Sequence, residues 1–71
     1  MIHEIKQPNG TSNFVISACN VWRPGAFTSR KAAWHGQRLS DEQLRDLQRR
    51  QPVGQAITLE QVKAERAKAT A

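Results

Sequence analysis

The sequence predicts an α+β fold: a single small domain, residues 1–71, in which an N-terminal β-hairpin is followed by three short helices (ββααα). A Pro-Asn-Gly turn separates two strand-like runs, two later helix starts repeat one capping signature, and proline and glycine divide the helical half. A domain of this size buries only about 60% of the surface that its unfolded chain exposes. We therefore expect marginal stability.

The hairpin is predicted over about residues 2–19. The runs IHEIKQ and SNFVISACNV flank PNGT, an order that suits a type I turn followed by left-handed Gly10. Because proline cannot donate a ladder hydrogen bond, a three-residue loop is favoured over a two-residue loop. A lone hairpin is unstable in water, so a helix or a strand of another chain must cover Ile2, Phe14 and Ile16.

Two helix starts carry the same capping signature. In LSDEQL, Ser40 can cap the helix while Gln43 closes a capping box. In ITLEQV, Thr58 and Gln61 repeat this arrangement. Each start also has a hydrophobic pair placed as a staple, Leu39 with Leu44 and Ile57 with Val62.

Breaks in the chain set the helix boundaries. RRQPVGQA separates helices expected over about residues 41–51 and 59–68, and the C-terminus is expected to fray because no large apolar residue follows Val62. Before them, a basic loop and a short helix are predicted over residues 22–36. Ser29 or Thr28 would cap this short helix, which stops near Gly36.

Positive charge is concentrated in one stretch. The formal net charge is +5, yet residues 1–21 and 40–51 are each neutral and residues 52–71 contribute +1. The remaining +4 lies in residues 22–39, where no acidic residue occurs. This imbalance indicates attraction to a polyanion, either nucleic acid or the acidic face of a protein.

The short helix has a basic, aromatic side. At about 100° per residue, Arg30, Lys31, Trp34 and His35 share one arc, and small residues occupy the other. Small residues let that side lie close against another element, which turns the basic arc outward. The predicted nucleic-acid-binding residues are Arg23, Arg30, Lys31, Trp34 and Arg38. Their cations would neutralise phosphates, and an exposed tryptophan could stack on an unpaired base or wedge at a groove.

The aromatic residues also have a structural interpretation. The chain has only four of them, Phe14, Trp22, Phe27 and Trp34, and a small core can hardly spare any. We expect Trp22 and Phe27 to be buried, and we favour burial of Trp34 over the exposure that stacking requires.

Several other functions are disfavoured. A helix-turn-helix is possible around GQRL, but its recognition helix would open with Asp41 and Glu42, which repel phosphates. The spacing of His3, His35 and Cys19 matches no zinc pattern, and no nucleophile with a base is apparent, so we expect no metal, no cofactor and no enzymatic activity.

The cellular setting follows from what the sequence lacks. A single cysteine cannot form an internal disulfide, which fits a reducing cytoplasm. The residues after Met1 contain no apolar region of a signal peptide, and no run is long enough to span a membrane. We expect a cytoplasmic protein with no membrane partner.

The run NVWRPGAFTSRKAAWHGQRLSDEQLRDLQ, followed by ITLEQV, resembles short uncharacterised proteins encoded in phage and prophage gene clusters. The shared features are an aromatic-Arg-Pro-Gly segment, a Ser-Arg-x-Ala-Ala segment and a Leu/Phe-x-Asp-Glu segment, over about residues 20–62. The chain differs at AWHGQRL, where a more aromatic stretch is expected. The resemblance implies a mobile-element protein acting in the host cytoplasm and brings no activity with it.

Two functions therefore stand side by side. The protein is a nucleic-acid-binding accessory or regulatory protein, or it is a protein-interaction module. In the second case it binds an acidic host or phage protein, or pairs with a second copy of itself through an open hairpin edge.

Overall fold

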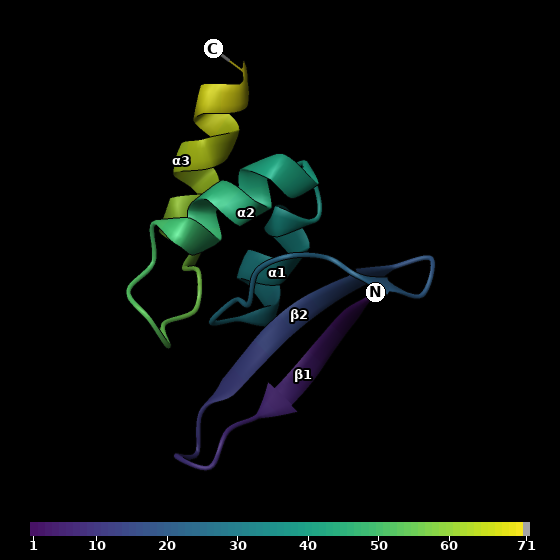
Figure 1. Cartoon of the computed structure of the whole chain (residues 1–71), viewed down its shortest axis with the longest axis vertical. Helices are drawn as coiled ribbons and strands as arrows, with labels where there is room; N and C mark the ends of the chain where they lie inside the picture. The colour runs from purple at the N-terminus through teal and green to yellow at the C-terminus, as the bar shows by residue number, and fades with distance from the viewer. Residues whose placement is uncertain (71) are drawn as a thin grey trace.

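The computed structural model describes residues 1–70, which form a three-stranded antiparallel sheet followed by three helices (Figure 1). The elements are β1 (Ile2–Lys6), β2 (Ser12–Ala18), β3 (Val21–Trp22), α1 (Arg30–Gly36), α2 (Asp41–Arg49) and α3 (Leu59–Thr70). The predicted α+β class and the order of strands before helices are confirmed. The sheet has one strand more than predicted.

The first hairpin has the predicted turn. β1 and β2 pair from Ile2 opposite Ile16 to Lys6 opposite Ser12. The Gly10 amide donates to the Gln7 carbonyl at 3.1 Å, and Gly10 has a φ of +87°. This left-handed glycine after a tight turn confirms the three-residue loop.

The strand that sequence analysis missed follows a second, tighter turn. Cys19 and Asn20 have φ angles of 51° and 65°, which turn β2 directly into β3. Two successive left-handed residues are the requirement of a type I′ hairpin turn, which usually contains glycine. ACNV has only the asparagine of that pattern, so the local signal is weak.

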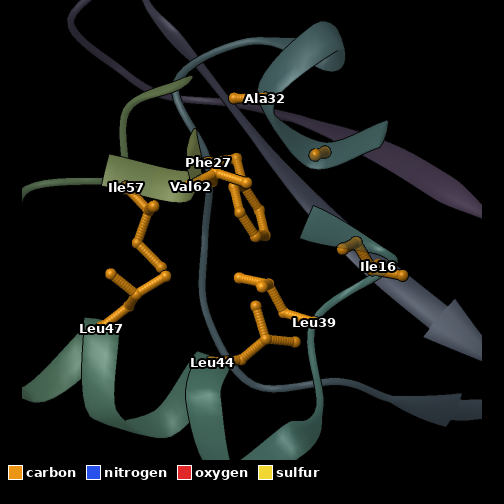
Figure 2. Close-up of a cluster of buried hydrophobic side chains, with 9 residues drawn as sticks. Ile16, Phe27, Ala32, Leu39, Leu44, Leu47, Ile57 and Val62 are labelled. Carbon is orange, nitrogen blue, oxygen red and sulfur yellow. The ribbon is translucent and has the colours of Figure 1, made fainter. Parts of the chain in front are cut away.

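The core is built around Phe27, which joins segments distant in the sequence. Its backbone exchanges hydrogen bonds of 2.8 and 2.7 Å with Phe14, and the neighbouring Ala26 carbonyl accepts from the Ile57 amide at 2.7 Å. Figure 2 shows its ring among aliphatic side chains from α2, α3 and the loops. The buried hydrophobic residues are Ile16, Phe27, Ala32, Ala33, Leu39, Leu44, Leu47, Ile57 and Val62. Both predicted staple pairs are therefore inside the core.

The predicted caps explain where the helices begin. Ser29 accepts from the Ala32 amide at 3.1 Å, so Ser29 rather than Thr28 caps α1. The capping boxes of Ser40 with Gln43 and of Thr58 with Gln61 are both present.

The helix ends differ slightly from prediction. α2 stops at Arg49, two residues early, and α3 continues to Thr70, past the predicted end near residue 68. The predicted fraying concerns the last residues, of which Ala71 lies outside the described part. No helix within residues 1–70 is long and apolar enough to cross a membrane.

The expected burial of both tryptophans is wrong. Trp22 is 62% exposed and Trp34 is 50% exposed, whereas Phe27 is fully buried as predicted. Aliphatic side chains around Phe27 fill the small core, which leaves the indoles outside. Trp22 lies on β3 with its ring edge-on to His3, at 4.9 Å between centroids.

Candidate nucleic-acid interface

Close packing of one side of α1 determines which residues it presents to solvent. Ala32, Ala33 and Gly36 are buried, as the helical arc predicts. Gly36 allows the closest approach, because a Cβ atom there would lie 2.5 Å from Cζ of Phe27. The opposite side of α1 is therefore the exposed one, and it carries Lys31 and Trp34.

The third helix adds cations that the sequence analysis did not assign to this surface. α3 packs against α1, and the Arg66 guanidinium donates to Nδ1 of His35 at 2.8 Å. Lys63 lies one helical turn before Arg66, on the same side of α3. We call this set of residues the α1–α3 cationic surface: Lys31, Trp34, His35, Arg38, Lys63 and Arg66.

The pKa of His35 shows how positive this surface is. Partial burial lowers the pKa of His35 from its ordinary value of 6.5, and four cations lower it further: Arg66, Lys31, Lys63 and Arg38. The imidazole is therefore neutral at pH 7. Since its Nδ1 accepts from Arg66, its proton lies on Nε2. Every charged group that shifts this pKa is a cation.

The acidic residues neutralise cations elsewhere in the molecule. Ion pairs join Arg23 to Asp41, Arg30 to Glu4, Arg49 and Arg50 to Asp46, and Arg50 and Lys68 to Glu65. Across the described chain, no salt bridge involves Lys31, Arg38 or Lys63. Three cations without a salt bridge in the described chain therefore lie together on the α1–α3 cationic surface, whereas Lys6 on β1 and Arg45 on α2 lie apart from it.

Trp34 is a half-exposed ring with one of these cations against it. The guanidinium carbon of Arg38 lies 5.1 Å from the centroid of the Trp34 ring, a cation–π distance. The His35 ring approaches it edge-on, with 5.1 Å between centroids. With these two neighbours in contact, half of the indole's area remains accessible to a partner.

Two of the five predicted site residues point elsewhere. Arg23 ties the segment between α1 and α2 to the rest of the fold, because its guanidinium donates to the carbonyls of Gln37 and Leu39 and to Asp41. Only 16% of its side chain is exposed. The Arg30 side chain points towards the hairpin, where its guanidinium carbon lies 5.4 Å from the centroid of the Phe14 ring. Lys31, Trp34 and Arg38 are the predicted residues that come together.

The sequence could have predicted only part of the role of Lys63 and Arg66. Their spacing of three residues places them on one side of a helix, which is visible in the sequence. That this side lies beside the basic arc of α1 depends on how α3 docks through Ile57 and Val62, and no local signal gives that docking.

The α1–α3 cationic surface has the chemistry to bind an anion and to stack an aromatic base. It offers guanidinium and ammonium donors, a neutral imidazole and an indole, and no carboxylate of the described residues is among the groups that shift the pKa of His35. Among the described residues, no three His, Cys, Asp or Glu side chains gather as a group that could hold a metal ion. Comparison with known protein families, curated proteins and solved structures found no match to this chain.

Proposed function

We propose that this protein is a non-enzymatic accessory protein that binds nucleic acid through the α1–α3 cationic surface. The observation that carries the proposal is the gathering of Lys31, Arg38, Lys63 and Arg66 around His35, next to the half-exposed Trp34, with no carboxylate among the groups that shift the pKa of His35. The resemblance of residues 20–62 to phage- and prophage-encoded proteins supports a role in the host cytoplasm, where nucleic acid is an abundant polyanion.

The surface would contact the backbone of the nucleic acid first. Lysine and arginine neutralise phosphates and release condensed counterions, which supplies affinity without sequence preference. Trp34 then offers an indole on which an unpaired base can stack, with Arg38 as the cationic neighbour of the same ring. A contribution from Trp34 would favour an unpaired strand over a duplex.

Removal of two cations from the surface tests the proposal. Lys31→Ala with Lys63→Ala should weaken binding to a labelled unpaired strand about tenfold and reduce the slope of log affinity against log salt by about 1.4. Neither lysine has a salt bridge in the described chain, so the fold should persist, as circular dichroism will check. Fluorescence anisotropy at several salt concentrations measures both quantities.

A matched control separates the surface from overall charge. Arg45→Ala with Arg49→Ala removes the same two charges from α2, where both side chains are exposed. We expect this pair to change affinity by less than about threefold. Equal losses for both pairs would show that net charge alone attracts the strand. Absence of binding at low salt would reject the proposal and favour an acidic protein as the partner.

A further inference from the structure

The first strand lies at an edge of the sheet. The strand order is β1-β2-β3, and the far side of β2 is occupied by β3 and by Phe27. Figure 1 shows β1 at the outer margin of the sheet. Within residues 1–70, no strand pairs with the outer edge of β1. An edge of this kind is a template for a further strand.

The pairing pattern shows which backbone groups β1 presents at this edge. Met1 and Ser17 exchange two hydrogen bonds, of 2.6 and 2.8 Å. Since antiparallel pairs alternate, the odd-numbered residues of β1 bond to β2, and Ile2, Glu4 and Lys6 direct their N–H and C=O groups outward. The edge therefore offers three residues with both a donor and an acceptor.

The side chains of β1 complement those of a second, antiparallel β1. With Ile5 opposite Ile5 of a second copy, Glu4 lies opposite Lys6 of that copy, and Lys6 lies opposite its Glu4. The outward backbone groups of Glu4 and Lys6 then form the hydrogen-bonded pairs, and the two Ile5 side chains meet at the closer, non-hydrogen-bonded position. The neighbouring register, with Glu4 opposite itself, places two like charges together and is disfavoured.

The exposure of these side chains agrees with a missing partner. Ile5 is 45% exposed on the face of the sheet opposite Glu4 and the covered Phe14, and it would be buried by its counterpart. Glu4 accepts from Ser12 and retains 39% exposure, so its carboxylate can receive a second cation.

We propose that two copies of this chain associate through β1 in this register and form one continuous six-stranded sheet. The net charge of +5 on the whole chain makes two copies repel each other. The edge of β1, by contrast, carries one acidic and one basic residue, so it is neutral and complementary to itself. The two-fold axis is perpendicular to the sheet, so both α1 helices cover the same face. Both α1–α3 cationic surfaces then lie on one side of the dimer. The dimer itself does not depend on nucleic-acid binding.

Charge reversal at the paired positions tests the register. Glu4→Lys or Lys6→Glu alone places like charges opposite each other and should weaken self-association about tenfold. An equimolar mixture of the two variants restores both opposite-charge pairs and should associate as the wild type does, as should the double variant Glu4→Lys/Lys6→Glu. Sedimentation equilibrium between about 10 µM and 1 mM covers the range of a weak dimer.

The expected wild-type mass rises with concentration towards twice the 8.0 kDa of one chain. Glu60→Lys and Lys63→Glu are matched controls that reverse the same charges on exposed positions of α3 and should leave association unchanged. A monomer at every concentration would overturn the proposal. So would a mixture that stays monomeric while each variant is folded by circular dichroism, or control variants that weaken association equally.

Discussion

Gly36 shows at the scale of one residue why a helix of seven residues can hold the functional surface. The residue was expected to stop the helix, and the helix does end there. Its larger role is contact: the Phe27 ring lies directly over its Cα, where any side chain would intrude. This contact sets α1 close to the core and turns Lys31 and Trp34 outward.

Substitution of Gly36 by alanine should therefore destabilise the protein. Alanine favours a helix over glycine by about 1 kcal/mol, but its Cβ would lie 2.5 Å from Cζ and 2.6 Å from Cε2 of the buried Phe27 ring. Overpacking of this kind costs about 1–3 kcal/mol, so we expect a net loss in the free energy of unfolding, measured with urea.

Phe27→Leu supplies the comparison background for this test. The smaller side chain leaves room for a Cβ atom, so Gly36→Ala should cost less in Phe27→Leu than in the wild type. An equal cost in both backgrounds would mean that the ring is not what excludes a side chain at position 36.

Among the elements, α3 is held by more than its short apolar start. Beyond Val62 the sequence offers no large apolar residue, yet the helix continues to Thr70. Glu65 is buried and accepts a hydrogen bond from Arg50 after the end of α2. This ion pair joins α3 to the end of α2 in the part of α3 that has no large apolar side chain.

The pH dependence of Glu65→Gln tests that role. The hydrogen bond from Arg50 lowers the pKa of Glu65 below its ordinary 4.5 and outweighs burial, which acts in the opposite direction. A carboxyl whose pKa is lower in the folded state stabilises at neutral pH, and this stabilisation is lost as pH falls through the folded pKa. Glu65→Gln should thus unfold at lower urea than the wild type at pH 7, and the difference should shrink below about pH 4.

Glu60→Gln is the control for this prediction, because Glu60 is an exposed acid on the same helix. It should leave the urea midpoint nearly unchanged at both pH values. If the urea midpoints of Glu65→Gln and the wild type still differ at low pH, the charge of the carboxylate is not the stabilising feature.

Local elements were predictable and their docking was not. The caps at Ser40 and Thr58 and the turn at Gly10 depend on neighbours within a few residues, so sequence alone places them. The exposure of Trp34 and the internal bonds of Arg23 depend on how distant segments meet. The missed strand β3 lies between these two cases. Its turn is a local feature, but the turn lacks the glycine that usually makes such a turn recognisable in the sequence.

The whole molecule separates two kinds of charge. Acidic residues pair with cations that tie elements together, such as Arg23 and Arg50, whereas Lys31 on α1 and Lys63 on α3 have no carboxylate partner in the described salt bridges. The net charge in the sequence gives the sign of the charge expected on the partner. The distribution of the ion pairs indicates where on the molecule that partner would bind. If two copies join through β1, two such places lie on one side of the assembly, and a strand that spans both would bind with avidity.

The most direct test of nucleic-acid binding is a ¹⁵N NMR titration of the protein with a short duplex and with an unpaired strand, each at low and at physiological salt. We expect the shifts to gather at Lys31 and Trp34 on α1, at Arg38 just after it, and at Lys63 and Arg66 on α3, and to shrink steeply as salt rises. The pKa of His35 should rise when the strand is bound, because phosphates offset the cations that lower it. Larger shifts with the unpaired strand would indicate stacking on Trp34. No shift at low salt, or shifts confined to other surfaces, would contradict the proposed function.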